Sequence, residues 1–239
     1  MSNELTRASD SDPSAISGHG MLIVVSSPSG GGKGTLIDRV LKTVPGVSYS
    51  VSYTTRAPRP GEQNGREYFF VSVPEFEAMR GRGELLEWAN VYGYLYGTSR
   101  AQVEHERAAG HDIILEIDVQ GAASIRQLVA DEVTVFILPP SFELLRKRLV
   151  ARGTDSPADL ERRLRGAPAE VKQYKDFQYV ILNDDINRAS AQLASVIYAE
   201  RARRERQAER LKDTLADFAQ VSEPPAAAGG CSHPSCRER

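Results

Sequence analysis

The chain has 239 residues, of which 41% are hydrophobic and 26% are charged, and its net charge is −2. This composition is ordinary for a globular domain whose core needs no disulfides, and the near-neutral charge argues against bulk electrostatic binding of nucleic acid. No apolar run approaches the roughly 18 residues of a membrane span. The first 20 residues are rich in Ser and Asp rather than basic, so we expect a cytoplasmic protein without a secretory signal.

The predicted elements begin with a buried strand at 21–26, followed by the stretch SSPSGGGKGT and a helix that Pro45 and Gly46 end. Residues 47–70 alternate around a Pro/Gly/Arg-rich loop and suggest short antiparallel strands. Three more buried strands follow in DIILEIDVQG, VTVFILPP and YVILND. An arginine-rich helical segment is expected from 141 to about 170, and a last helix from about 188 to 220.

The stretch SSPSGGGKGT resembles the phosphate-binding pattern G-x-x-x-x-G-K-[ST], the P-loop. The strand before it and the helix after it supply the expected context, because glycine amides and a helix N-terminus bind phosphate while Lys33 reaches the β- and γ-phosphates. Ser27 replaces the first Gly of the pattern, and Gly34 replaces the hydroxyl that binds Mg²⁺. Thr35 either contacts the α-phosphate or the metal, so Mg²⁺ is expected to be held mainly by phosphates and water. The predicted ATP-binding residues here are Ser29, Gly30, Gly31, Gly32, Lys33, Gly34 and Thr35.

Buried strands that alternate with helices predict an α/β fold with a parallel sheet of the P-loop NTPase type. The block at 51–101 breaks that alternation and is expected to be an inserted, mostly-β lobe. The tails at 1–19 and 221–239 lack apolar periodicity and are expected to be disordered. We expect the P-loop core to consist of residues 20–50, 102–142 and 169–220. We expect residues 143–168 to form a helical lid.

The region SYTTRAPRPGEQNGREYFF concentrates arginines in a proline-containing loop. A guanidinium can bind a phosphate through two parallel hydrogen bonds, so this excess of positive charge fits a dianionic phosphate. Further along, LLEWANVYGYLYGTS carries Glu87. A carboxylate suits the N1–H and N2–H donors of guanine, whereas the N1 acceptor of adenine would face it unpaired, and discrimination of roughly 10⁴ is attainable.

These motifs, with EIDVQGA, FILPPS, RLVARGTDS and VILNDD in the same order, resemble the guanylate kinase family over roughly 21–200. The resemblance implies that 51–101 is a GMP-binding lobe and that the chain transfers the γ-phosphate of ATP to GMP or dGMP with Mg²⁺. Thr98 stands where Ser is usual, and Glu116 stands where Asp is frequent. The implied GMP-binding residues are Ser52, Arg56, Arg59, Glu62, Tyr68, Glu87, Tyr96, Thr98 and Asp118.

Arginines between 146 and 165 fit a lid that neutralises charge on the transferred phosphoryl group. The resemblance implies this role for Arg148, Arg152 and Arg163, with Lys33 and Arg56 as further catalytic groups. Arg146, Arg162 and Arg165 are expected to be solvated. Asn183 matches a position near the adenine of ATP, although a helix N-cap at Asn183 or Asp184 fits equally. No general base is expected, because the acceptor phosphate is already ionised.

Two alternative functions remain open from the sequence. Guanylate-kinase-like modules bind phosphorylated peptides without catalysis, although they typically lose the P-loop that this chain keeps. A nucleoside monophosphate kinase with another base preference is the second, and Glu87 with Thr98 argues against it.

Partners other than ATP and GMP, such as nucleic acid or a membrane, are not expected, and the chain could be a monomer or a homodimer. Tyr92 and Tyr94 are expected to pack within the small lobe, and the tail residues Cys231, His233 and Cys236 form only a weak metal-ligand pattern.

Overall fold

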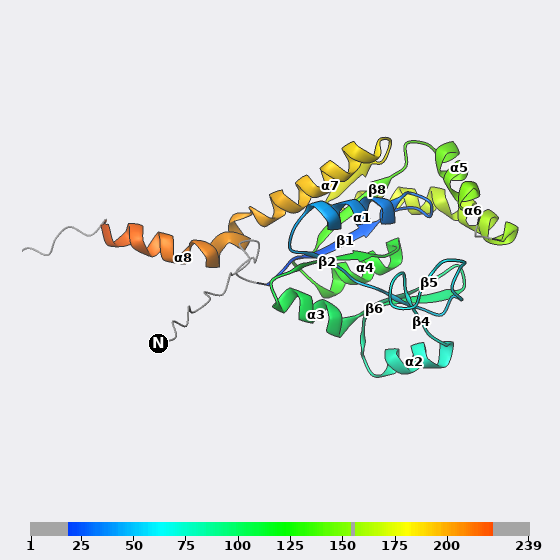
Figure 1. The fold of residues 1–239 in the computed structure, drawn as a ribbon, viewed down its shortest axis with the longest axis horizontal. Coiled ribbons are helices and arrows are strands. Elements are labelled where there is room, and N and C mark those ends of the chain that lie inside the picture. Colours follow the sequence, from blue (N-terminus) through cyan, green and yellow to red (C-terminus); the bar gives the residue numbers. More distant parts are fainter. Residues whose placement is uncertain (1–18, 154–155, 222–239) are drawn as a thin grey trace, which may run out of the picture.

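The computed structural model describes residues 19–153 and 156–221. At its centre lies a five-stranded parallel sheet with the strand order β2-β7-β1-β8-β9, covered by helices on both faces (Figure 1). Its strands are β1 (Leu22–Ser26), β2 (Val47–Tyr49), β7 (Asp112–Glu116), β8 (Val133–Leu138) and β9 (Tyr179–Leu182). The helices are α1 (Lys33–Thr43), α2 (Val73–Gly81), α3 (Arg100–Ala108), α4 (Val119–Leu128), α5 (Phe142–Arg152), α6 (Pro157–Lys172), α7 (Ile186–Arg201) and α8 (Arg204–Val221).

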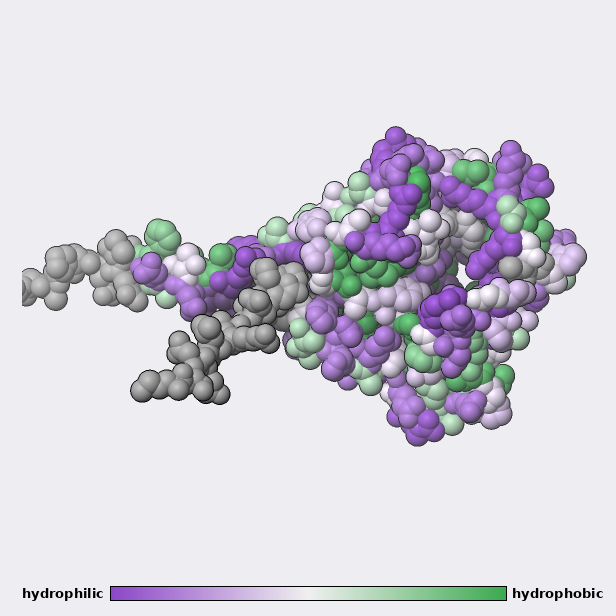
Figure 2. Space-filling model, viewed as in Figure 1, coloured by the Kyte–Doolittle hydropathy of each residue, from purple (hydrophilic) through white to green (hydrophobic). Residues whose placement is uncertain are grey.

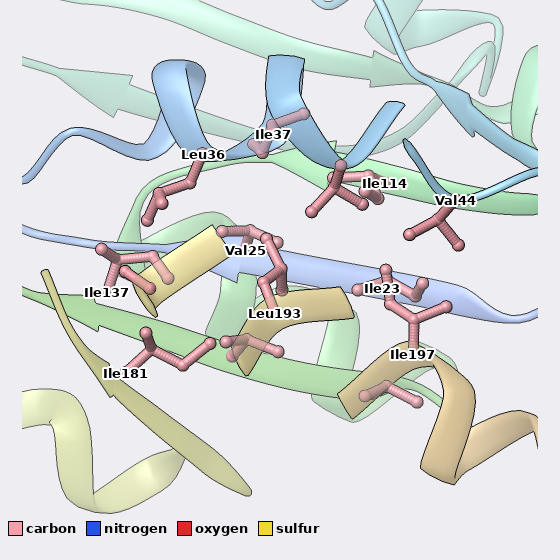
Figure 3. Packing of buried hydrophobic residues seen from close by; sticks show 14 of the residues in the cluster. Ile23, Val25, Leu36, Ile37, Val44, Ile114, Ile137, Ile181, Leu193 and Ile197 are labelled. Atoms are coloured by element: carbon pink, nitrogen blue, oxygen red, sulfur yellow. The ribbon is translucent and has the colours of Figure 1, made fainter. Parts of the chain in front are cut away.

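The central strand β1 is buried on both faces. Ile23 and Val25 pack against α1 and α7 (Figure 3), whereas Leu22 and Val24 belong to a second cluster with residues of α3 and α4. Successive side chains of a strand point to opposite faces, so a strand covered on both sides reads as one continuous apolar run. This three-layer arrangement confirms the predicted α/β class with a parallel sheet.

A smaller sheet with the order β4-β3-β6-β5 is built within the predicted lobe. Its strands are β3 (Tyr53–Thr54), β4 (Phe69–Phe70), β5 (Leu85–Val91) and β6 (Tyr94–Ser99). The strands β5 and β6 form an antiparallel hairpin, and α2 lies beside this sheet, away from the parallel sheet (Figure 1). The limits of core, lobe and lid remain predictions.

Several local expectations differ from the structure. The segment 47–49 pairs in parallel with β7, and β3 pairs in parallel with β4, although the alternation around the long loop had suggested antiparallel strands. Helix α4 was not expected, because its small residues give little apolar periodicity. The arginine-rich segment is two helices, since the chain turns at Gly153 with a positive φ of 62°. The last expected helix is also two helices, α7 and α8, and α8 projects from the body (Figure 1).

The carboxyl ends of the five parallel strands meet at one edge of the sheet. There β1 leads into the glycine loop, β7 ends at Glu116, and β9 is followed by Asn183. The chain places β7 on one side of β1 and β8 on the other, which is the switch point where α/β sheets form a ligand crevice. Within the described ranges, no helix combines the length and the apolarity needed to cross a bilayer.

An ion pair at the opposite edge connects α7 to the sheet. Asp112 is fully buried and accepts hydrogen bonds from the Met21 amide at 2.8 Å and from Arg201 Nε at 2.7 Å. Arg201 Nη2 also donates to the Pro45 carbonyl at 2.8 Å. Removal of one partner from such a pair leaves a buried charge without its counter-ion.

We therefore expect Arg201→Met to lower the free energy of unfolding by about 3 kcal/mol, measured by urea denaturation. The matched control is Arg204→Met, because Arg204 forms an exposed pair with Glu205. The control should leave the urea midpoint unchanged. Equal midpoints for the two variants would show that Arg201 does not stabilise the fold in this way.

Candidate active site

One cavity of about 1190 Å³ lies at the carboxyl edge of the sheet, between the P-loop, the small lobe and helices α5 and α6. The space-filling view shows the surface hollowed between the α5–α6 part and the β-lobe, with hydrophilic residues bordering the hollow (Figure 2). Every predicted site residue lines this cavity except Arg56 and Thr98. Those two side chains lie behind its wall and are 6% and 0% exposed as residues.

The P-loop owes its shape to its glycines and to side chains from distant elements. Gly30 and Gly32 have positive φ angles of 87° and 91°, which side chains other than glycine rarely adopt. The Gly31 carbonyl accepts hydrogen bonds from Asn183 Nδ2 at 2.8 Å and from Arg148 Nη1 at 3.4 Å. Lys33 Nζ donates to Ser27 Oγ at 3.1 Å, so the lysine lies along the loop where phosphates would bind.

The helix N-cap alternative for Asn183 and Asp184 is wrong. Asp185 is the N-cap of α7, and its carboxylate accepts a hydrogen bond from the Arg188 amide at 2.8 Å. Asn183 is instead 3% exposed and holds the loop, while its own carbonyl accepts from Arg148 Nη2 at 3.0 Å. Its proximity to an adenine remains a prediction, and it lines the cavity that such a base would enter.

Glu87 on β5 is a buried carboxyl at the other end of the cavity. It is 5% exposed, and Thr98 on β6 donates a hydrogen bond of 2.6 Å to its Oε1. Burial raises the pKa of the Glu87 carboxyl to about 7; the Thr98 hydrogen bond opposes this rise, and the charge of Asp118 adds to it. Asp118 itself caps α4, because its Oδ1 accepts from the Gly121 amide at 2.9 Å. A Cβ at Gly121 would lie 2.6 Å from Glu87 Oε2, so this helix approaches the carboxyl too closely for any larger residue.

The arginine loop holds one of its arginines by an internal ion pair. Arg56 Nη2 lies 2.9 Å from both carboxylate oxygens of Glu62, and Glu62 also accepts from the Arg59 amide at 2.7 Å. The Arg56 guanidinium stacks over the Tyr68 ring at 5.5 Å. Glu62 therefore orients Arg56, whereas Arg59, Tyr68 and Tyr96 face the cavity directly. Ser52 is buried and lines the same wall.

The predicted lid arginines lie on α5 and α6. Arg163 Nη1 donates to Ser29 Oγ at 2.8 Å, and Arg152 is exposed on the cavity wall. Of the arginines expected to be solvated, Arg146 and Arg165 pair with Glu143 and Glu161 on their own helices. No cluster of three or more His, Cys, Asp or Glu side chains in the described chain could hold a metal by itself. The pattern of Cys231, His233 and Cys236 lies outside the described residues.

Comparison with known proteins agrees with this geometry. The family profile described as guanylate kinase matches residues 19–200. The chain belongs to the guanylate kinase family. A guanylate kinase of Symbiobacterium thermophilum is 50% identical over 196 residues, covering 82% of this chain and 93% of that protein. One from Dechloromonas aromatica is 53% identical over 180 residues, covering 75% and 89%. The crystal structure of guanylate kinase from Anaplasma phagocytophilum superposes with a TM-score of 0.70 at 32% identity, covering 84% of this chain and 98% of that one.

Family membership confirms the resemblance, the P-loop kinase fold and the ATP:GMP phosphotransferase activity that the motifs implied. The roles of individual site residues are not tested by these comparisons and remain predictions. The matched region ends at residue 200, so helix α8 lies beyond it.

One contact of the site was not predicted from the sequence. Tyr92 was expected to pack within the lobe, but its hydroxyl donates a hydrogen bond of 2.6 Å to Glu170 Oε1 on α6. The other oxygen of Glu170 accepts from the Ser29 amide of the P-loop at 3.0 Å. Tyr92 has a positive φ of 55° in the tight turn between β5 and β6, an unfavourable angle for a bulky residue. The hydrogen-bonded contacts from Tyr92 to Glu170 and from Glu170 to Ser29 thus join the β5–β6 hairpin, helix α6 and the P-loop.

We expect Tyr92→Phe to lower kcat about tenfold, because the loss of one hydrogen bond to the Glu170 carboxylate weakens the contact between the hairpin and α6 by about 1.5 kcal/mol. Steady-state kinetics would measure this change, and thermal unfolding would check that the fold is intact. Tyr94→Phe is the matched control, since Tyr94 follows Gly93 in the same hairpin and is 38% exposed. If both variants keep the wild-type kcat, the contact does not contribute to turnover.

Proposed function

We propose that the chain binds ATP at the P-loop and GMP or dGMP in the small lobe, and transfers the γ-phosphate in line between them. The observation that supports this most directly is the buried carboxyl of Glu87 in the same cavity as the P-loop. Guanine would present two N–H donors to that carboxylate, whereas other bases would leave it unpaired. Residues from one chain suffice for this site, which fits a monomer or a homodimer, and we place the reaction in the cytoplasm.

In the proposed reaction an oxygen of the GMP phosphate forms a bond to the γ-phosphorus of ATP, and the bond from that phosphorus to the β-bridging oxygen breaks. ADP leaves with the electron pair of the broken bond. Lys33, Arg148, Arg152 and Arg163 would stabilise the charge that spreads over the transferred oxygens. Arg56 and Arg59 would hold the acceptor phosphate, which needs no general base because it is already ionised.

We propose that the cofactor is Mg²⁺, which would enter the site bound to ATP. When bound with the nucleotide, the ion would supply positive charge that neutralises part of the charge of the triphosphate. The oxygen-bearing side chains next to the loop fit this ion, since Thr35 and Glu116 both line the cavity beside Gly34. Carboxylate and hydroxyl oxygens are the ligands that Mg²⁺ accepts, and it keeps several waters in such sites.

The proposal is tested by ADP release in the presence of ATP, Mg²⁺ and each of GMP, dGMP, AMP, CMP and UMP. We expect turnover with GMP and dGMP and a preference of roughly 10⁴ over AMP. Glu87→Gln should lose most of this preference, because the amide replaces one acceptor oxygen by a donor. Equal preference in the wild type and the variant would refute the guanine assignment, and GMP binding without turnover would favour the phosphopeptide-module alternative.

Binding of GMP should also depend on pH. Glu87 must be ionised to accept both guanine donors, and burial raises its pKa to about 7. Affinity should therefore be full above pH 7 and fall about tenfold per unit as the pH drops below 7. Calorimetry between pH 5.5 and 8.5 would measure this. Glu87→Gln is the control, because its remaining pH dependence reports only the second ionisation of the nucleotide phosphate, near 6. Parallel profiles for the two proteins would exclude Glu87 as the titrating group.

A further inference from the structure

Helix α8 leaves the body of the protein at the edge of the sheet opposite the cavity, where α7 ends beside the start of β7 (Figure 1). The family match ends at residue 200, so the domain shared by the family does not include this helix. Every residue from 208 to 219 is exposed. Most of the stability of a protein helix comes from the packing of an amphipathic face, so a projecting helix gains stability from a partner along its length.

The first turn of α8 is fixed to the body by polar contacts. Glu200 at the end of α7 is 3% exposed, and its Oε2 lies 3.3 Å from Arg203 Nη1 and 3.7 Å from Arg206 Nε. Arg206 Nη2 also donates a hydrogen bond of 2.9 Å to the carbonyl of Asp131, in the loop before β8. These contacts set the direction in which the rest of α8 extends from the body.

One face of the projecting part of α8 is apolar. Leu211 and Leu215 are 39% and 61% exposed, and they lie on the same side of the helix because they are four positions apart. Ala208 and Phe218 continue the spacing three positions to either side, which is the repeat of a helix that packs against another helix. Figure 2 shows hydrophobic surface on this helix among hydrophilic residues. The pattern indicates a contact between helices.

The charges of α8 are divided between its two halves. The half at 204–212 carries four basic and two acidic side chains, and the half at 213–221 carries two acidic side chains and no basic one. This is the reverse of the distribution that stabilises a single helix, which favours acids near its N-terminus and bases near its C-terminus. A partner of one charge sign would match one half and repel the other. A second α8 that runs in the opposite direction matches both halves.

We propose that two copies of this chain pair through α8, with the two helices antiparallel and Leu211 of each copy packed against the partner's Leu215. A two-fold axis near residue 213 generates both contacts, as an interface between identical surfaces requires. Each basic half then lies beside the acidic half of the partner, whereas a parallel pair would bring like charges together. Because α8 extends away from the cavity, the pairing leaves both cavities open and does not depend on the reaction.

Sedimentation equilibrium of the full-length protein over a wide range of concentration tests the pairing. We expect a dimer in the wild type and a dissociation constant at least roughly a hundredfold higher in Leu211→Gln/Leu215→Gln, because each substitution removes an apolar contact at two places of the symmetric interface. Glutamine favours a helix about as well as leucine, so α8 should persist, and circular dichroism would check this.

The matched control is Ala216→Gln. Ala216 is exposed, and it follows Leu215 directly, so its side chain points about 100° away from the apolar face. This variant should change the dissociation constant less than twofold. A monomeric wild type would overturn the proposal. Equal dissociation constants for the double variant and the control would also overturn it, because the dimer would then form through another surface.

The orientation of the two helices is tested by a distance between spin labels. A nitroxide is attached to Arg204→Cys in a protein that also carries Cys231→Ser/Cys236→Ser, and double electron–electron resonance measures the separation. Antiparallel helices centred near residue 213 place the two labels roughly 27 Å apart along the helix axis. A parallel pair leaves only the separation of the helix axes, about 10 Å, and the label arms. The short distance would overturn the antiparallel arrangement.

Turnover separates this inference from the proposed function. ADP release from ATP and GMP should change less than twofold per chain in the α8 variants, since the cavity lies at the opposite edge of the sheet. A wild type that dimerises but does not phosphorylate GMP would overturn the proposed function and support the pairing. A wild type that phosphorylates GMP but stays monomeric would overturn the pairing alone.

Discussion

The hydrogen bond from Asn183 Nδ2 to the Gly31 carbonyl is the contact on which the geometry of the phosphate loop depends most directly. The loop must leave backbone N–H groups free for phosphate, so it cannot be held mainly by its own hydrogen bonds. The Gly31 carbonyl of the loop instead accepts hydrogen bonds from Asn183, which follows β9, and from Arg148 of α5. Glu170 of α6 occupies one loop amide, at Ser29. The shape of the loop is therefore set by its glycines together with segments more than a hundred positions away.

The end of the cavity around Glu87 depends on the burial of a carboxyl group rather than on hydrogen bonds that hold a backbone segment. Glu87 is enclosed by β6 and by the close approach of α4, and Thr98 is the group that hydrogen-bonds its carboxyl. A charge in such a place is unfavourable without hydrogen-bond donors, and burial therefore raises the pKa of the Glu87 carboxyl. In the proposed function the same cost would make the site selective, because a base without two suitable donors could not relieve it. Selectivity would then follow from how tightly α4 packs on the hairpin.

Much of this arrangement could be predicted from local patterns. The run Leu22–Val25 is apolar because both faces of β1 are covered, and the helical spacing of Leu36, Ile37 and Val40 follows from one buried face. The partners of individual side chains were harder to predict. The orientation of Arg56 toward Glu62 and the path from Tyr92 to Glu170 depend on tertiary packing, and the second pair is separated by 78 positions. Helix α4 was missed because its small residues give a weak helical pattern, and one of them, Gly121, leaves room for Glu87 although glycine disfavours a helix.

Two positions that differ from the more frequent residues of these motifs lie side by side in the fold. Gly34 stands where the general P-loop pattern has a hydroxyl, and Glu116 stands where the family often has Asp. The parallel pairing of β1 with β7 brings these positions together across the sheet edge, with the longer carboxylate beside the position that lacks a side chain. One extra methylene extends the reach by about 1.5 Å, a distance comparable to the gap that a missing Cβ leaves. A shorter acid at 116 would leave that space unfilled, and a larger residue at 34 would compete for it, so the loop and the strand constrain each other.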